Sequence, residues 1–418
     1  MQSTKISFWG AVVINLNIVI GASFFLNAQN IQLKSGFMAP ISWLVCGCLF
    51  APLVVVLAKL AALYPADGGI YVYSEKILGR FWGFMSSWGY FIGATAGNAV
   101  VVRAFSHYLQ QLSFMQPLLQ ATGLKEMTVD LLVVFIFALL NFMNIQFLEH
   151  IEVMFTLLKV IPLLLLTGGL FFLFDASNLS APATVHMKDL LDVFPMVLFA
   201  YIGIEACCTV MTKIDDTKHR PSRVLGVSFL LIVLVYFLLQ TSIFLIYGQQ
   251  NVNPFLTILP QLTHNTFIIE WGNKLIYLAI LSSFLGGFYG MYYYNNWNLY
   301  VLARDKILKG GSYLTKLNKN QVPWVCVFVQ TFFLLVFLIT CSDLYLMMIS
   351  GFGVVLAYLL SALAFLVLKR SLLGFLALAS CSLLLFLTTL DLFQAGFYTL
   401  MPFLIIMIMG IFLYRSKA

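Results

Sequence analysis

Long apolar runs alternate with short polar connections along the whole chain. The runs lie at residues 8–33, 38–63, 83–112, 128–148, 150–174, 190–213, 225–248, 273–303, 323–341, 343–368, 372–392 and 394–414. A membrane-spanning helix needs about 20 consecutive apolar residues, and each run is about that long or longer. The pattern therefore predicts an all-α integral membrane protein with twelve transmembrane helices.

Two of the predicted spans are interrupted near mid-depth. The first contains Ile20-Gly21-Ala22-Ser23-Phe24-Phe25, and the sixth contains Phe199-Ala200-Tyr201-Ile202-Gly203-Ile204-Glu205. Glycine in a membrane helix most often serves close packing. Interruptions five spans apart, however, are what two inverted five-helix repeats predict, with substrate bound between the broken helices. We expect one transmembrane domain over residues 1–418, with repeat one at about 8–174, repeat two at about 190–368 and two accessory helices at about 372–414.

Composition excludes several classes of protein. Of the 418 residues, 61% are hydrophobic and 9% are charged, whereas soluble domains carry about a quarter charged residues. A water-soluble globular protein, a nucleic-acid-binding protein and an ordinary cytosolic enzyme are excluded, because none could keep so much apolar surface from water. The chain also lacks a His-x-x-x-His pair and a Gly-rich phosphate loop, and we expect neither a metal nor a cofactor.

The basic residues are sorted by side. Seventeen of the 23 Lys and Arg residues fall on one side of the predicted spans, and Lys34, Lys125, Lys188 and Lys274 fall on the other. By the positive-inside rule both termini are cytoplasmic, and we expect a bacterial inner membrane. The excess of Lys and Arg residues indicates how the chain is oriented in the membrane, and no anionic macromolecular partner is needed to explain it.

Ionisable residues inside a span are functional candidates, because burying them in a bilayer costs about 2.5–3.5 kcal/mol. Glu205 follows the break at Gly203 and is a candidate proton carrier; the alternative is a protonated carboxyl group that links two helices. Lys159 lies deep in the fifth span, unless its long stem reaches the cytoplasmic surface. Arg103 lies toward the outer side of the membrane, and we interpret it as a packing or vestibule residue. Asn98 either faces the cavity or joins helices.

Four motifs, in the right order and spacing, resemble the amino acid-polyamine-organocation superfamily of secondary transporters. They are the break at Gly21, Tyr64-Pro65-Ala66-Asp67-Gly68-Gly69-Ile70-Tyr71, the break at Gly203, and Ser283-x-x-Gly286-x-x-x-Gly290 ending in Ala303-Arg304-Asp305. The resemblance covers spans one to nine. It implies the LeuT-like fold, with broken helices one and six and 5+5 inverted repeats.

The resemblance also implies roles for particular residues. In relatives the first break binds the substrate carboxylate, which points to Gly21, Ala22 and Ser23, and carbonyls of both breaks bind the amine. For the second break these would belong to Phe199, Ala200 and Ile202, and Phe199 would also close over the substrate. Glu205 and Gly97-Asn98 match the arginine/agmatine antiporters. Lys159 matches sodium-independent relatives, in which a lysine replaces a sodium ion, with Ser283 as its neighbour.

Departures from the family pattern bear on the substrate. Ser23 replaces a usual glycine, Met291 replaces a tryptophan that stacks on guanidinium groups, and Trp297 replaces a basic residue. The substrate side chain would then meet Asn98 and Met291, which favours a neutral amino acid.

We expect a proton-coupled or exchanging transporter that works by alternating access. The alternatives are a polyamine or basic amino-acid antiporter, an intramembrane transferase, for which the acidic residues are too dispersed, and a non-transporting amino-acid sensor.

Overall fold

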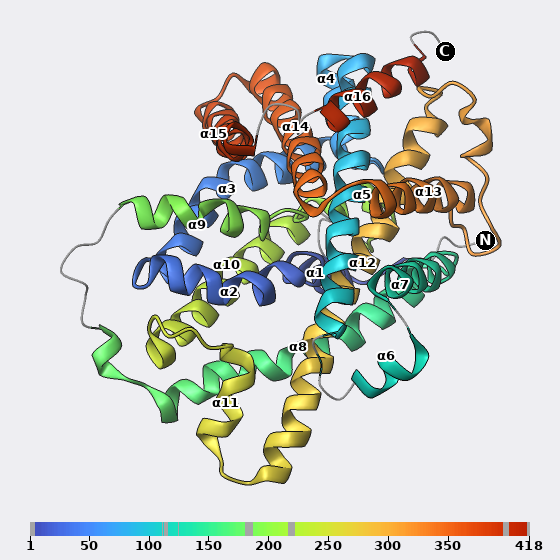
Figure 1. Cartoon of the computed structure of the whole chain (residues 1–418). Coiled ribbons are helices and arrows are strands. Elements are labelled where there is room, and N and C mark those ends of the chain that lie inside the picture. Colours follow the sequence, from blue (N-terminus) through green and yellow to red (C-terminus); the bar gives the residue numbers. More distant parts are fainter. Residues whose placement is uncertain are drawn as a thin grey trace.

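The computed structural model describes residues 5–110, 112, 116–123, 125–179, 187–215, 222–395 and 401–415, and helices dominate it (Figure 1). The helices are α1 Phe8–Val19, α2 Ala22–Ser35, α3 Met38–Leu63, α4 Ile70–Leu78, α5 Arg80–Gln110, α6 Gln116–Thr122, α7 Glu126–Leu140, α8 Ile145–Leu173, η1 Ala176–Leu179, α9 Met187–Phe199, η2 Ala206–Lys213, α10 Arg223–Tyr247, α11 Pro254–Leu262, α12 Thr266–Arg304, η3 Gly311–Tyr313, α13 Trp324–Thr340, α14 Asp343–Lys369, α15 Leu372–Ala395 and α16 Met401–Leu413.

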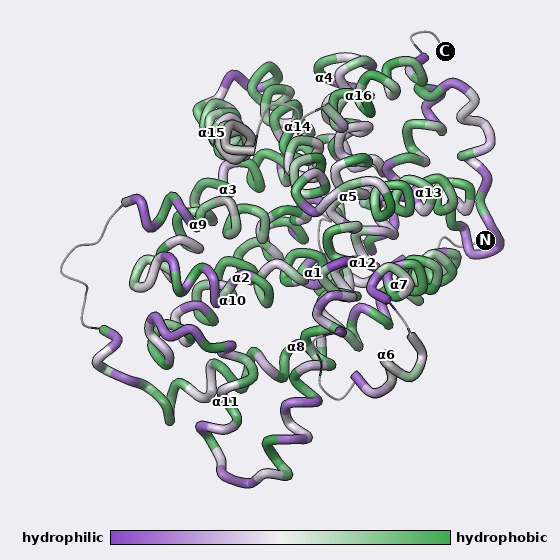
Figure 2. Tube along the Cα trace, viewed as in Figure 1, coloured by the Kyte–Doolittle hydropathy of each residue, from purple (hydrophilic) through white to green (hydrophobic). Residues whose placement is uncertain are grey.

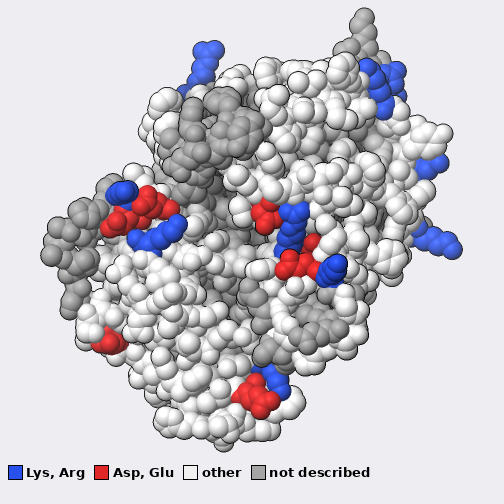
Figure 3. All heavy atoms as spheres, in the orientation of Figure 1, with Lys and Arg blue, Asp and Glu red and all other residues white. Residues whose placement is uncertain are grey.

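The helices are apolar enough for a bilayer. Within the described residues, α3, α8, α10, α12 and α14 are each long and apolar enough to cross it, and the bent pair α1 and α2 would make a sixth span. Hydrophobic residues dominate the helices in Figure 2, and most of the surface seen in Figure 3 is uncharged. The chain is an integral membrane protein, and the count of twelve spans stays a prediction.

Helix α12 lies at the centre of the bundle. Its 39 residues extend about 58 Å at a rise of about 1.5 Å per residue, which exceeds the thickness of a bilayer core. In its most apolar stretch 78% of the residues are buried, whereas the corresponding figure for α8 is 22%. Helix α12 packs against both α5 and α8, so groups on these three helices can meet inside the protein.

Small residues bring α5 and α14 into direct backbone contact. A Cβ atom added to Gly353 of α14 would lie 2.4 Å from the carbonyl oxygen of Gly89 and 2.8 Å from the Cα atom of Gly93, both on α5. Glycines four residues apart on one helix face allow such an approach between membrane helices. The contact brings Ser350 of α14 beside Gly97 of α5, next to the central site.

The helices are interrupted at both positions that the sequence predicts. Helices α1 and α2 meet at residues 20–21 with a bend of 47°. Helix α9 ends at Phe199, and residues 200–205 form turns before η2 begins. Gly203 has φ +103°, a backbone conformation that glycine adopts without steric cost. Inverted repeats would explain this pairing, and the repeat relationship itself stays a prediction.

One predicted boundary is wrong. Hydropathy separates the fourth and fifth spans near residue 149, but the turn between α7 and α8 lies at residues 141–144. The side chain of Asn144 caps α8 by accepting a hydrogen bond of 2.9 Å from the backbone N–H of Phe147. The polar residues Glu149 and Glu152 therefore belong to the early turns of α8 and do not end a helix.

Candidate functional site

A cavity of about 60 Å³ lies between the two helix breaks and is called the central cavity here. Residues from six helices and from both breaks line it: Ile18, Gly21, Ala22, Ser23, Ala94, Gly97, Asn98, Val101, Phe199, Ile202, Gly287, Met291, Ser350 and Val354. None of these side chains is charged. The cavity is smaller than the roughly 300–1,000 Å³ of typical ligand pockets.

The structure brings most of the predicted substrate-binding residues together. Gly21, Ala22, Ser23, Asn98, Phe199, Ile202 and Met291 all line the central cavity. Ala200 is not among the lining residues, and its carbonyl oxygen accepts a hydrogen bond of 3.0 Å from the hydroxyl of Tyr236. The sequence analysis missed Ser350 and Val354 of α14, because a serine or a valine in an apolar span gives no functional signal.

Residues of the first break line the central cavity. Helix α2 begins at Ala22, and its N-cap residue Gly21 makes no side-chain cap hydrogen bond. The first N–H groups of a helix carry partial positive charge and attract anions. Asn98 is 3% exposed, and its side-chain nitrogen has no hydrogen-bond partner among the described residues. The cavity thus combines an electropositive helix end with a free amide donor.

Lys159 is tied to the first break. Its ammonium nitrogen donates a hydrogen bond of 2.7 Å to the carbonyl oxygen of Ile20, and the hydroxyl of Ser283 donates one of 2.9 Å to the same oxygen. Lys159 is 3% exposed, so its stem does not reach the cytoplasmic surface. The predicted neighbours Lys159 and Ser283 therefore meet at one carbonyl of the broken helix, outside the lining of the central cavity.

Glu152 is a buried ionisable residue that the sequence analysis missed. It is fully buried on α8, two helical turns before Lys159, and the two side chains interact electrostatically. The amide nitrogen of Asn17 on α1 donates hydrogen bonds of 2.6 Å to both the side-chain Oε2 and the backbone oxygen of Glu152. The misplaced boundary near residue 149 had put Glu152 at a membrane edge, where a charge needs no explanation.

Glu205 lies behind the second break. It is fully buried, and the hydroxyl of Tyr358 on α14 donates a hydrogen bond to its carboxyl group. The backbone N–H of Gly203 donates a hydrogen bond of 3.5 Å to the same hydroxyl. Glu205 therefore links the second break to α14, and it is not among the residues that line the central cavity.

Two further side chains connect the breaks. The hydroxyl of Tyr236 on α10 lies 2.7 Å from the carbonyl oxygen of Val19 and 3.0 Å from that of Ala200. The amide nitrogen of Asn15 donates a hydrogen bond of 2.8 Å to the carbonyl oxygen of Ile204. Because buried carbonyl groups need partners, these contacts hold the two irregular segments beside each other.

The motif at residues 64–71 packs against η2, which follows the second break. The carboxylate of Asp67 accepts hydrogen bonds from the backbone N–H and the hydroxyl of Thr212, at 2.9 and 2.6 Å. The backbone N–H of Gly68 donates to the carbonyl oxygen of Thr209 at 3.1 Å. Nearby, the ammonium nitrogen of Lys213 lies 3.7 Å from the ring centroid of Trp297. These contacts lie on the side of the bundle that the charge pattern predicts to be cytoplasmic.

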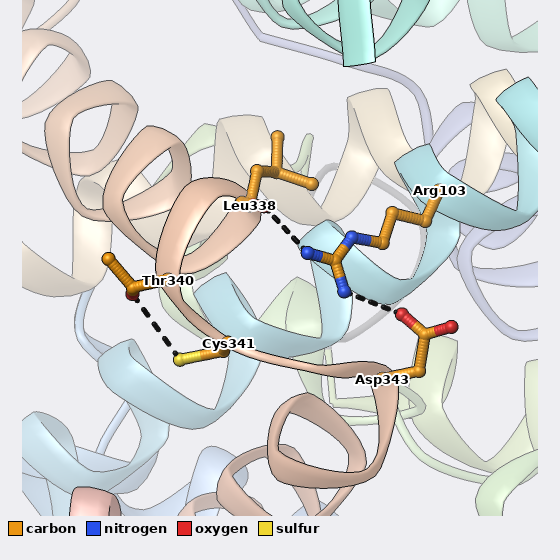
Figure 4. Close-up of polar contacts among 5 residues, drawn as sticks. All are labelled: Arg103, Leu338, Thr340, Cys341 and Asp343. Atoms are coloured by element: carbon orange, nitrogen blue, oxygen red, sulfur yellow. Dashed lines mark hydrogen bonds and ion pairs between the residues drawn. The ribbon is translucent and has the colours of Figure 1, made fainter. Parts of the chain in front are cut away.

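Arg103 is not among the residues that line the central cavity, and Figure 4 shows its polar contacts. Its guanidinium group donates a hydrogen bond of 2.6 Å to the carbonyl oxygen of Leu338 near the end of α13 and forms an ion pair of 2.7 Å with Asp343 at the start of α14. The side chain bridges the turn between these helices, and the interpretation as a packing or vestibule residue stays a prediction.

Curated relatives cover different shares of the chain. An uncharacterized transporter of Mycobacterium tuberculosis is 24% identical over 254 residues, which are 59% of this chain and 54% of that protein. The arginine/ornithine antiporter of Pseudomonas aeruginosa is 25% identical over 80% of this chain and 72% of its own. The serine/threonine exchanger SteT of Bacillus subtilis is 22% identical over 86% of this chain and 82% of its own. The chain thus spans about half the length of the mycobacterial relative.

The family comparison covers far more of the sequence than the mycobacterial match. The family model described as amino acid permease matches residues 6–414. That range includes both helix breaks, every residue that lines the central cavity, and the buried residues Glu152, Lys159 and Glu205. The chain belongs to the amino acid permease family.

Proposed function

We propose that this protein moves amino acids across the cytoplasmic membrane by alternating access around the two helix breaks. The observation that carries the proposal is the central cavity, which lies between the breaks and includes residues of both. Ligand sites between discontinuous helices are typical of secondary transporters built from repeats. The family membership and the names of the relatives support the same activity.

The two ends of an amino-acid backbone fit different parts of the cavity. We assign the carboxylate to the backbone N–H groups at Gly21, Ala22 and Ser23, where α2 begins without a side-chain cap. We assign the amine to carbonyl groups of the breaks, because unwound carbonyls bind cations. Phe199 and Ile202 line the cavity at the second break, whereas the carbonyl of Ala200 is engaged by Tyr236 and would need to exchange this partner.

The lining of the cavity favours a small neutral side chain. A guanidinium or ammonium group that is buried requires a carboxylate or several acceptors, and the lining contains no charged residue. The hydroxyls of Ser23 and Ser350 and the amide of Asn98 are matched to a small polar group. The substrate named for the serine/threonine exchanger fits this lining better than those named for the arginine/ornithine antiporter.

Lys159 is the group that we propose for energetic coupling. Its ammonium nitrogen and the Ser283 hydroxyl both donate hydrogen bonds to the carbonyl oxygen of Ile20. The positive charge of Lys159 therefore holds the end of α1 in place. Transport would then need no sodium ion there. Release of the Lys159 proton would weaken the contact and free the first break to move, and Glu152 lies two turns away on the same helix as an internal counter-charge.

Glu205 is the second group that we propose for gating. Its carboxyl group holds the hydroxyl of Tyr358, which in turn accepts from the Gly203 N–H. Rearrangement of the second break would have to change this chain of hydrogen bonds. Phe199 stands at the end of α9 and lines the cavity, where an aromatic ring would cover the bound substrate.

Counterflow tests the proposed function. Proteoliposomes loaded with one unlabelled amino acid and supplied with its labelled form should accumulate the label when that amino acid is serine, threonine or alanine, with and without a pH gradient and in the absence of sodium. Arginine, ornithine and lysine are tested in the same way. Accumulation of arginine or ornithine alone would instead support a basic amino-acid antiporter. Binding without any counterflow would identify a non-transporting sensor, and a requirement for sodium would contradict the role given to Lys159.

The variant Phe199→Ala tests the assignment of the cavity. We expect substrate affinity to fall about tenfold, which corresponds to about 1.4 kcal/mol, because the ring no longer covers the substrate. Equilibrium binding of the labelled substrate to purified protein measures the change. Phe171→Ala is the matched control, since Phe171 lies on α8 with 89% of its surface exposed. An unchanged binding isotherm for Phe199→Ala would remove Phe199 from the site.

A further inference from the structure

A second and larger pocket lies at the ends of α3 and α14, away from the central cavity. It has a volume of about 440 Å³ and is lined by Lys59, Ala62, Leu63, Phe365, Lys369 and Ser371. We call it the lysine pocket. It shares no lining residue with the central cavity, and nothing in the proposed transport mechanism uses it.

Two cations from different helices meet at the lysine pocket. Lys59 lies in the last two turns of α3, and Lys369 is the final residue of α14. Both are exposed, and within the described part of the chain neither forms an ion pair with an acidic residue. Arg370 follows Lys369 directly, and the turn into α15 is hydrophilic (Figure 2). The pocket therefore carries positive charge that the described protein residues do not balance.

The walls of the lysine pocket are apolar. Phe365 is 3% exposed and forms its buried side, while Leu63 remains 48% exposed at its rim. A small inorganic anion would use only the lysines, because hydrocarbon gives an ion no favourable contact, whereas this pocket combines cations with apolar side chains. The combination fits an amphipathic ligand with a negatively charged head.

An exposed apolar track leads away from Lys59 along α3. Leu44, Cys48 and Val55 are exposed on the face of α3 that also carries Lys59. Helix α15 packs against α3 and exposes Leu372, Phe375 and Leu376 next to the turn that holds Lys369. In a membrane protein such faces contact acyl chains, and the track places those chains beside the charged pocket.

We propose that the lysine pocket binds the headgroup of an anionic phospholipid, whose acyl chains lie along the exposed faces of α3 and α15. The phosphate would contact the ammonium groups of Lys59 and Lys369 and the hydroxyl of Ser371. The charge pattern predicts that this end of the bundle is cytoplasmic, and basic pockets between helices on that side hold anionic headgroups. The lipid would hold α14 and α15 to α3 through charges from both sides of the pocket.

Native mass spectrometry of the purified chain, titrated with phosphatidylglycerol or phosphatidylcholine, tests the proposal. The unaltered protein should bind phosphatidylglycerol more tightly than phosphatidylcholine. Lys59→Gln/Lys369→Gln should lower the affinity for phosphatidylglycerol about thirtyfold, since each lysine near an anionic lipid contributes about fivefold. The single variants should each lose about fivefold, and they provide the same test if the double variant is unstable.

Lys76→Gln/Lys319→Gln is the matched control, because it removes two exposed lysines from the same predicted side and none from the pocket. It should bind phosphatidylglycerol as the unaltered protein does. Equal losses in the two double variants would show a general surface charge effect and overturn the proposal. Equal affinities for the two lipids, or displacement of phosphatidylglycerol by millimolar glycerol 3-phosphate, would overturn it as well. Counterflow activity is not needed for this readout, so it stands apart from the proposed function.

Discussion

Replacing Lys159 with alanine should reduce gradient-driven uptake to less than about a tenth of that of the unaltered protein. The ammonium group donates to the carbonyl oxygen of Ile20 at 2.7 Å, and a hydrogen bond from a charged donor contributes about 1.5–3 kcal/mol, which is a factor of ten or more. If Lys159 also carries the coupled proton, the uptake that remains should no longer respond to a pH gradient. Uptake of labelled substrate by proteoliposomes, at matched protein density, measures both effects.

Ser283→Ala is the control, because it removes the neutral donor to the same carbonyl group. It should lower uptake modestly, in keeping with about 0.5–1.5 kcal/mol for a neutral hydrogen bond, and should keep the pH response. Lys159→Ala also leaves Glu152 without its nearby cation, which destabilises a buried carboxyl group. The double variant Lys159→Ala/Glu152→Gln should therefore regain thermal stability without regaining uptake. Normal pH-dependent uptake in Lys159→Ala would contradict the coupling role.

The helix breaks were predictable because they depend on local sequence. Gly21 and Gly203 interrupt apolar runs that lie five spans apart, and this pairing, not either glycine alone, indicated the breaks. Ser23, Phe199 and Ile202 beside them were named from the family resemblance, and all three line the central cavity. Lys159 was also detectable, because an ammonium group in an apolar span requires a partner.

The parts that were missed depend on tertiary structure. Tyr358 and Tyr236 hold the second break through their hydroxyls, but a tyrosine in a membrane helix gives no indication of which carbonyl or carboxyl group it meets. Ser350 reaches the central cavity only because glycines bring α5 and α14 together. Glu152 was missed for a different reason, since the boundary of its helix was misplaced, and an Asn144 cap is easy to overlook beside several charged residues.

Gly203→Ala should be the most damaging of the small substitutions at the second break. An added Cβ atom would lie 2.8 Å from Cγ2 of Ile18 and 3.2 Å from Cε of Met291, and both side chains line the central cavity. Backbone strain at φ +103° costs about 1–3 kcal/mol, and overpacking of a filled site costs about 1–3 kcal/mol more. We expect a lower melting temperature in detergent and a loss of most counterflow.

Gly226→Ala makes the same change where the structure leaves room for it. Gly226 lies inside α10, and among the described residues no heavy atom outside the neighbouring backbone of this helix would lie within 4 Å of an added Cβ atom. Alanine is preferred to glycine in a helix by about 0.5–1 kcal/mol, so this variant should melt at the same or a slightly higher temperature and transport normally. A Gly203→Ala protein that matched it in both measurements would show that the second break tolerates a side chain. The close contacts among Gly203, Ile18 and Met291 would then not limit how the cavity opens.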